Sequence, residues 1–545
     1  MKRLKVFLSI LIIVILGCVS MFFIYREILN KKANDSYYFH KHKAREFLKE
    51  GLFYDALVSS DKAILKEKDN PNAYFLKIKA LLKLKNFNEI ENCINEAKSL
   101  CKQDFEIKKI TKLENLLQKE KKIFEKYLKE HDNAKLIKPY LNSISKHKVK
   151  IKDNDIFYND FGVRGVKATK KINSGKVIVE IPRDMLILSS EAKKFICEKY
   201  SKENKKNIKE IEKIIDQCYK KNTFSLGLFL LENKNNEKFK EYLNIIFSND
   251  YSSFPITFNE KTIALLDNTS LENNIYNLKK DLDHDLDLLY KIDSVKKYDK
   301  QTLINIYSAV SSRNFGWDFN GKNEMLLVTY IDLVNNGKKK NSNWYFDSKK
   351  NSFCLKTIKN IKENEEIFDE YGSLKSNSRL LLNYGFTLPE NNENSECVID
   401  INEIPFVCRK NVNKKDKSNN LLDVLKYLRK KNNTEENNLS KIEKEKTIMN
   451  ILQSICAKKK SKFNTTLDED KKFLKDNSSK MSFNEINCYR VRIEEKEVLD
   501  WILKFIEECI AVLSKHTTTE NLVKFIKEEK NIGKSVKEYL SDVFV

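Results

Sequence analysis

The chain has 545 residues, of which 101 are lysine or arginine and 78 are aspartate or glutamate, so its formal net charge is +23. Hydrophobic residues make up 41% and aromatic residues 11% of the chain, which is enough to bury sizeable cores and excludes a fibre or a wholly disordered protein. Its 12 glycines and 6 prolines are few for this length, which argues against a turn-dense all-β protein. We therefore expect several domains, mostly helical, with one compact strand-rich part.

One segment near the N-terminus differs from the rest of the chain. Residues 6–25 carry no charged side chain, and as a helix this run would be roughly 30 Å long and able to span a bilayer. Basic residues are more numerous after the run than before it, so the positive-inside rule predicts that the large C-terminal part of the chain lies in the cytosol. The alternative is a signal peptide that leads into the secretory pathway, because Lys2, Arg3 and Lys5 precede the run. We expect residues 1–36 to be a transmembrane anchor with its basic flank, or such a signal.

The cysteines and histidines give no sign of a metal site. The 11 cysteines contain no C-x-x-C pair, and the 6 histidines form no H-E-x-x-H motif. These patterns argue against a zinc ribbon, a disulfide framework and metal-dependent hydrolysis. We predict reduced, mostly buried thiols and no bound metal.

The positive charge does not by itself indicate nucleic-acid binding. The lysines are spread through polar loops without interleaved aromatic side chains, whereas a nucleic-acid footprint concentrates charge on one face. A solvated basic surface explains the charge equally well. We therefore expect no nucleic-acid partner.

The first helical region repeats itself. Within residues 37–130 the pattern recurs at an offset of 34 residues, which aligns Phe53 with Phe87 and Ala63 with Ala97. This period resembles the tetratricopeptide repeat, with about two copies and a long basic helix as a cap. An ordinary bundle of helical hairpins is the alternative. We expect residues 131–148 to be a linker.

From about residue 149 the pattern changes from helical to extended. Residues 165–170 alternate between apolar and polar side chains, residues 172–175 form a turn, and residues 176–182 make a second strand that ends at a proline. Residues 190–312 return to a helical pattern. The sequence thus predicts a small β unit that is interrupted by a helical insert.

Short phrases in this region resemble a SET domain in their order and spacing. They are G-V-R-G-V-K-A-T (162–169), I-N-S-G-K-V-I-V-E-I-P (172–182), S-R-N-F (312–315), D-L-V-N-N (332–336), I-F-D-E-Y-G (367–372) and S-N-S-R-L-L-L-N-Y-G-F (376–386). They are most similar to SET-domain protein methyltransferases of the Rubisco lysine methyltransferase type. A fainter similarity extends into the C-terminal part through residues 489–499.

This resemblance implies an α+β fold with three parts. A β-rich SET domain at 149–389, with its helical insert at about 190–312, would be flanked by the N-terminal helical repeats. A helical substrate-binding-like domain would follow at 390–545. Its polar tracts at 409–420 and 430–438 are rich in lysine and asparagine, so we expect them to be disordered loops.

The resemblance also implies an activity, which is transfer of a methyl group from S-adenosylmethionine to a nitrogen of a protein. Such a displacement at carbon depends on holding the donor and a neutral amine in line. A lysine with a pKa of about 10.4 must first lose its proton, which a desolvated channel favours. The family pattern assigns the catalytic hydroxyl to Tyr371. No cysteine trio follows Tyr371, so the zinc-bearing tail of many histone-directed SET enzymes is absent, and we expect a lysine of a non-histone protein as the substrate.

The donor-binding residues follow from the same resemblance. An arginine of this family pairs with a carboxylate, a D-x-x-N motif engages the donor, and a glycine turn lets the backbone approach it. The matching positions here are Arg164, Gly165, Arg313, Asp332, Asn335 and Asn336.

Two departures from the family pattern leave a second function open. The chain has Asn335-Asn336 where the family usually has Asn-His, and Val163-Arg164-Gly165 where it has a G-x-G turn. If these changes abolish donor binding, the protein would be a catalytically inactive scaffold that binds partner peptides through its helical domains.

Overall fold

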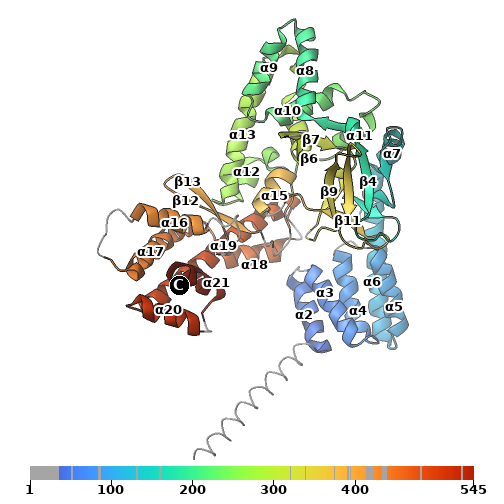
Figure 1. Ribbon diagram of the computed structural model, residues 1–545. Coiled ribbons are helices and arrows are strands. Elements are labelled where there is room, and N and C mark those ends of the chain that lie inside the picture. The colour runs from blue at the N-terminus through green and yellow to red at the C-terminus, as the bar shows by residue number, and fades with distance from the viewer. Residues whose placement is uncertain are drawn as a thin grey trace, which may run out of the picture. The chain divides into compact units, whose positions relative to one another are not determined.

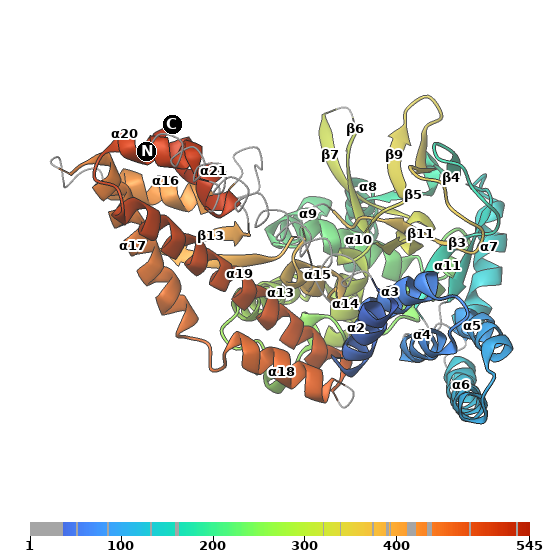
Figure 2. The same ribbon diagram turned by 90° about the horizontal axis from the view of Figure 1, so that it is seen from below.

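The computed structural model (Figures 1 and 2) describes most of the chain. The described residues are 36–50, 53–83, 87–130, 133–158, 163–319, 321–337, 339–372, 375–388, 392, 394–410, 412, 421–432, 439–478, 481–529 and 532–545. They fall into two compact units, the first within residues 1–133 and 158–163 and the second within residues 134–157 and 164–545.

The first unit is built from helices that pack in chain order. They are α2 (Tyr37–Glu50), α3 (Phe53–Lys66), α4 (Pro71–Lys83), α5 (Phe87–Leu100) and α6 (Asp104–Glu130). Ala56, Ala63 and Ala97 are fully buried, and their small side chains allow neighbouring helices to approach closely. The helical N-terminal region is confirmed, whereas its assignment to tetratricopeptide repeats stays a prediction.

The expected linker contains regular structure of its own. Residues Asn133–Leu136 form a 3₁₀ turn and α7 spans Ile137–Ser145. Tyr140 and Ile144 are buried, and α7 packs on α11 (Lys240–Phe247). The segment is therefore part of the second unit.

The second unit holds three small sheets of the SET region (Figure 1). The first has the strand order β1 (Lys150–Ile151), β4 (Val177–Pro182), β10 (Ser352–Thr357) and β9 (Ser342–Asp347). The second has the order β2 (Asn154–Tyr158), β3 (Arg164–Ala168), β11 (Glu366–Asp369) and β8 (Asn335–Asn336). The third has the order β5 (Leu186–Leu188), β7 (Lys322–Val328) and β6 (Asn314–Phe319). The predicted β unit is confirmed, and its strands come from two stretches of sequence far apart.

A helical insert separates those two stretches, as predicted. Its α-helices are α8 (Ser189–Asn204), α9 (Ile208–Gln217), α10 (Lys221–Glu232), α11, α12 (Glu260–Ala264), α13 (Ser270–Leu289) and α14 (Lys300–Ser311). Asp285 is buried, and its carboxylate accepts hydrogen bonds from the N–H groups of Tyr219 and Lys220, each at 2.8 Å, just before α10 begins. A negative charge at this end of a helix is favourable, so Asp285 stabilises the start of α10.

The C-terminal part is mainly helical. It comprises α15 (Asn377–Tyr384), β12 (Glu396–Ile401), β13 (Ile404–Arg409), α16 (Leu421–Asn432), α17 (Lys441–Lys460), α18 (Leu467–Asn477), α19 (Phe483–Ser514), α20 (Thr519–Glu528) and α21 (Lys534–Phe544). The long helix α19 packs against α17, α18 and β12, and also against α12 and α15; Figure 2 shows α17 and α18 beside it. The α+β fold class with a helical C-terminal region is thus confirmed. The two tracts predicted as disordered loops lie mostly outside the described residues.

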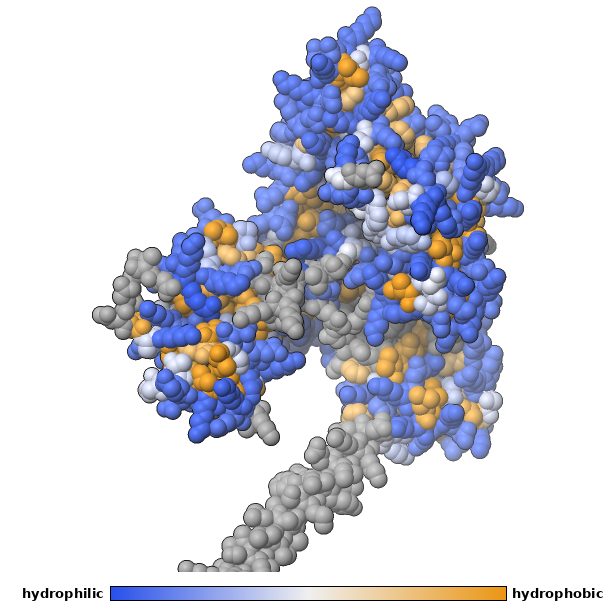
Figure 3. Space-filling model, in the orientation of Figure 1, coloured by the Kyte–Doolittle hydropathy of each residue, from blue (hydrophilic) through white to orange (hydrophobic). Residues whose placement is uncertain are grey.

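The cores take up most of the apolar side chains. On the face drawn in Figure 3, hydrophilic residues cover most of the described surface, and apolar residues form small scattered patches. The ten cysteines that the structure describes are free, and all but Cys101 are buried, as the sequence predicts.

The prediction of a membrane-anchored protein is contradicted. Within the described ranges, no helix combines the length and the apolar sequence that a membrane span needs. The longest of these helices, α19, has 32 residues, but charged side chains such as Glu485, Arg490 and Lys504 recur along it. The segment predicted as an anchor or signal, residues 6–25, lies outside the described residues. We therefore withdraw the transmembrane helix, the membrane partner and the membrane-anchored, cytosol-facing localisation.

One buried carboxyl joins α19 to the SET region. Glu494 is 5% exposed, and its Oε1 accepts a hydrogen bond of 2.9 Å from the backbone N–H of Asn377 at the start of α15. Burial raises the pKa of Glu494 to about 8. The folded protein therefore holds this proton at a pH where the unfolded chain has lost it.

Glu494→Gln should make the protein more stable at alkaline pH. Between the ordinary carboxyl pKa near 4.5 and the folded value of about 8, the folded state binds more protons, so the free energy of unfolding falls as pH rises. Glutamine keeps the acceptor oxygen but does not ionise. We expect nearly equal stability of the two proteins near pH 4, below the ordinary carboxyl pKa, and at pH 9 a gain for the glutamine variant of a few kcal/mol, on the order of 1.4 kcal/mol per pKa unit. Urea unfolding across this range is the measurement, with exposed Glu363→Gln as the control. If the free energy of unfolding changed with pH in the same way for the wild type and Glu494→Gln, the raised pKa of Glu494 would be contradicted.

Candidate active site

The site is organised around two segments that pair side by side. Strand β8 runs parallel to β11, with Asn335 opposite Phe368 and Asn336 opposite Asp369. The N–H of Gly337 donates to the carbonyl of Asp369 at 2.9 Å, which extends the pairing by one residue. The D-L-V-N-N and I-F-D-E-Y-G phrases therefore lie next to each other.

Tyr371 is held at both its backbone and its hydroxyl. Its N–H donates to Oδ1 of Asn336 at 2.9 Å, and its hydroxyl donates to the carbonyl oxygen of Val334 at 3.0 Å. The Tyr384 hydroxyl donates to the Tyr371 carbonyl at 3.0 Å, and the two rings lie 4.7 Å apart. β11 ends at Asp369, so Tyr371 lies in the turn after the strand.

Burial sets the protonation state of this phenol. It raises the pKa of Tyr371 well above its ordinary value near 10, although the nearby Arg313 opposes the shift. The hydroxyl is therefore a neutral hydrogen-bond donor throughout the physiological pH range.

Arg164 and Gly165 meet Asn335 at the next strand. The Asn335 side-chain amide donates to the Arg164 carbonyl at 2.7 Å and to Oε1 of Glu366 at 2.8 Å. Burial raises the pKa of Glu366 while the Asn335 hydrogen bond lowers it. A Cβ at Gly165 would lie 2.9 Å from Nδ2 of Asn335, 3.0 Å from the Phe157 ring and closer still to the Glu366 carboxylate. Only a glycine fits here without moving this network.

Arg313 and Asp332 form a buried pair. Nη1 of Arg313 lies 3.6 Å from Oδ2 of Asp332 and donates to the Asp332 carbonyl at 3.3 Å. The Tyr242 hydroxyl donates to the same Oδ2 at 2.6 Å. Burial raises the pKa of Asp332, and Arg313 counteracts this. Arg313 Nε and Asp332 Oδ1 are buried and make no hydrogen bond within the described part of the chain, so one donor and one acceptor remain available.

The structure brings all the predicted site residues into one neighbourhood, while their functional roles stay predictions. Tyr371, Asn335 and Asn336 lie on the paired segments, Arg164 and Gly165 on β3, and Arg313 beside Asp332. Sequence reasoning missed Tyr242 and Tyr384. Tyr384 stands in the last quoted phrase and could have been found there, whereas Tyr242 lies in the insert, where helical periodicity gives no sign of its role.

Two protein-family models match parts of this chain. A model of the SET domain matches residues 163–372. A model described as Rubisco LSMT substrate-binding matches residues 412–499. Both matches confirm the predicted resemblance.

Individual relatives agree with these matches. A protein of Schizosaccharomyces pombe named SET domain-containing protein 8 is 26% identical over 233 residues, which is 42% of this chain. The chain matches only 51% of that curated relative's length.

Solved structures show the same fold. The SET domain of LSMT bound to lysine and AdoHcy aligns with a TM-score of 0.52 and 14% identity, over 76% of this chain and 99% of that one. Rubisco LSMT bound to AdoMet aligns with a TM-score of 0.51 and 16% identity, over 75% and 99% of the two chains. At such identities the likeness establishes the fold.

Gly165→Ala should destabilise the SET region. The new methyl group would push against Asn335 and Glu366 and disturb their hydrogen bonds, so we expect a loss of about 1–3 kcal/mol in the free energy of unfolding. Gly316→Ala on β6 is the matched control, because a Cβ there meets nothing within 4 Å. Urea unfolding of both variants tests this, and equal stability of the two would show that the site tolerates a side chain at Gly165.

Proposed function

We propose that this SET-domain protein is an S-adenosylmethionine-dependent N-methyltransferase that modifies a lysine of a non-histone protein. The observation that carries the proposal is the position of Tyr371, whose neutral hydroxyl is held by the Val334 carbonyl beside the paired strands β8 and β11. The family matches and the fold of Rubisco LSMT support it.

The residues at the site fit the proposed donor. Its amino-acid end carries a carboxylate and an ammonium group, which match an arginine N–H donor and a carboxylate acceptor. Arg313 Nε and Asp332 Oδ1 are such groups, buried and without a hydrogen-bond partner in the described part of the chain. We expect Arg164, Gly165, Asn335 and Asn336 to complete the donor site.

Each residue has a distinct task in this proposal. When bound, S-adenosylmethionine supplies a methyl group, which its sulfonium carries. The lysine nitrogen forms a bond to the methyl carbon while the bond between this carbon and the sulfur breaks. The amine proton leaves to water. Tyr371 orients the acceptor nitrogen through its hydroxyl. Asn336 fixes the Tyr371 backbone through its side-chain oxygen, so an asparagine can position the tyrosine where the family usually has a histidine.

The acceptor class rests on two features of the chain. The cysteine trio of many histone-directed enzymes is missing after Tyr371. A region similar to the Rubisco LSMT substrate-binding domain follows instead. Both features favour a non-histone protein as substrate.

The full-length protein should bind S-adenosylmethionine at one site. Titration calorimetry should give one-to-one binding, and a donor concentration of about 100 times Kd should stabilise the protein by about 2.7 kcal/mol, because the ligand binds only the folded state. Absence of heat and of a thermal shift at millimolar donor would contradict the enzyme and favour the inactive scaffold.

Tyr371→Phe should keep donor binding but lose most turnover. The variant removes one preorganised hydroxyl, which we expect to lower kcat about 100-fold or more. Transfer of isotopically labelled methyl groups to lysate proteins measures it, with calorimetry of the donor in parallel. Tyr276→Phe on α13 is the control, since Tyr276 is 42% exposed. Unchanged turnover would remove Tyr371 from its catalytic role.

A further inference from the structure

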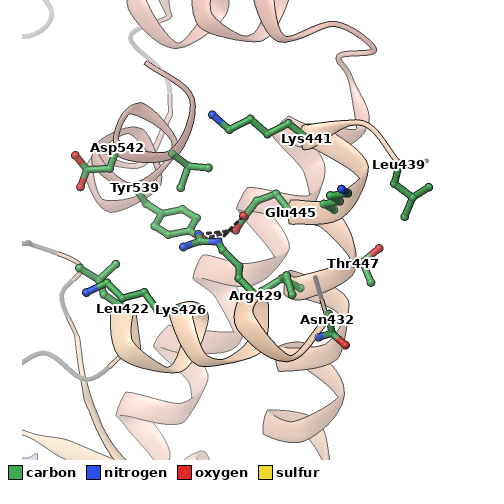
Figure 4. Close-up of a pocket in the computed structure, with 13 residues that line it drawn as sticks. Leu422, Lys426, Arg429, Asn432, Leu439, Lys441, Glu445, Thr447, Tyr539 and Asp542 are labelled. Carbon is green, nitrogen blue, oxygen red and sulfur yellow. Dashed lines mark hydrogen bonds and ion pairs between the residues drawn. The ribbon is translucent and has the colours of Figure 1, made fainter. Parts of the chain in front are cut away.

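The C-terminal helices enclose a cavity that the methyl-transfer site does not use. It has a volume of about 420 Å³ and lies between α16, α17 and α21 (Figure 4). Cavities that bind ligands commonly fall in the range of about 300–1,000 Å³. Tyr539, Asp542 and Val543 of its lining lie beyond the substrate-binding match at residues 412–499.

The charges inside the cavity neutralise one another. Arg429 binds Glu445 through two hydrogen bonds, Nε to Oε2 at 2.8 Å and Nη2 to Oε1 at 2.9 Å. The Tyr539 hydroxyl contacts both side chains, and Figure 4 shows the three groups converging. Glu445 and Tyr539 are 4% and 1% exposed. This cluster is therefore satisfied and leaves the cavity interior without a free charge.

The mouth of the cavity has a net positive charge, because the lysines of its lining, Lys426, Lys441 and Lys444, outnumber the one exposed carboxylate there, Asp542. Lys441 and Lys444 project from the first turns of α17, and within the described residues neither ammonium is paired with a carboxylate. The Lys441 ammonium lies 5.2 Å from the centre of the Phe544 ring. Lys426 is paired only weakly, at 3.4 Å from the exposed Asp423. The rim thus offers at least two cations to an anionic partner.

Apolar side chains also line the cavity, next to the polar Asn432 and Thr447. The apolar residues are Leu422, Leu439, Ile448 and Val543. A small inorganic anion would leave these walls uncovered, whereas an aliphatic side chain would bury against them. The occupant that matches both surfaces carries carboxylates next to an apolar side chain.

We propose that this cavity docks an acidic segment of a partner protein, with one leucine-like side chain inside and flanking carboxylates on Lys441 and Lys444. The partner class rests on the proposed function, since the protein to be methylated is the partner that such an enzyme must hold. The docking surface is separate from Tyr371 and its neighbours. It selects the substrate protein by charge and shape.

The test is peptide binding to the full-length protein, measured by fluorescence anisotropy. The probe is a fluorescein-labelled peptide Asp-Glu-Leu-Glu-Leu-Glu-Asp. A second labelled peptide, in which serine replaces both leucines, is compared with it. Lys441→Glu combined with Lys444→Glu should weaken binding of the leucine peptide by about tenfold or more. The serine peptide should bind wild type at least about tenfold more weakly, because it leaves the apolar walls exposed.

A matched charge reversal serves as the control. Lys524 and Lys527 are exposed, have the same spacing along α20 and do not line the cavity. Lys524→Glu combined with Lys527→Glu should therefore leave binding within about twofold, because solvent and salt screen exposed charges that do not touch the peptide. Circular dichroism checks that both double variants are folded.

Three outcomes would overturn the proposal. The first is wild-type affinity in the Lys441/Lys444 variant, and the second is equal binding of the leucine and serine peptides. The third is complete displacement of the peptide by phosphatidylserine vesicles, which would assign the surface to a membrane.

Calorimetry with S-adenosylmethionine is run in parallel. Loss of donor binding with intact peptide binding would refute the proposed function, whereas the reverse result would refute the docking site alone.

Discussion

The candidate site depends on a very short strand pairing. β8 and β11 share only two residue pairs, too few to be stable alone. Asn341 reinforces them, because its side chain accepts from the Phe368 N–H at 2.8 Å and donates to the Glu366 carbonyl at 2.9 Å, as a neighbouring strand would. A Cβ at Gly337 would overlap the Phe368 side chain, so a glycine is needed for the two segments to come this close. This arrangement determines the position of Tyr371, and the geometry of the whole site depends on it.

Buried ionisable groups at the site are paired without being fully satisfied. Asp332 has both Arg313 and the Tyr242 hydroxyl as partners, which offsets much of the cost of burying its charge. A buried donor or acceptor that makes no hydrogen bond costs about 1–3 kcal/mol. Arg313 Nε and Asp332 Oδ1 carry that cost in the described structure. Such a cost is characteristic of sites where a ligand, rather than the fold, completes the hydrogen bonds.

The sequence predicted the segments in which a periodic pattern runs over many residues, and it failed for the short ones. Alternation identified β3 and β4, and a long helical pattern identified the insert. The nine-residue helix α7, with a proline inside it, gave too little pattern and was expected to be a linker. β8 has only two residues and therefore no readable period, so the sequence did not predict its pairing with β11. The partners Asn341 and Tyr242 come from a loop and the insert, where tertiary packing alone determines their contacts.

The long helix α19 packs on helices of both the proposed docking cavity and the candidate site. One stretch of it, with Cys488 and Val491, shares a core with Ile263 of α12 and Leu381 of α15. Further along, Ile502 and Phe505 share a core with α17 and α21, the helices that line the cationic cavity. In the proposed mechanism, two contacts on one chain raise the effective concentration of an acceptor lysine near Tyr371 once the acidic segment is bound. The choice of substrate would then depend on the spacing between the acidic segment and the acceptor lysine, and little on the residues next to that lysine.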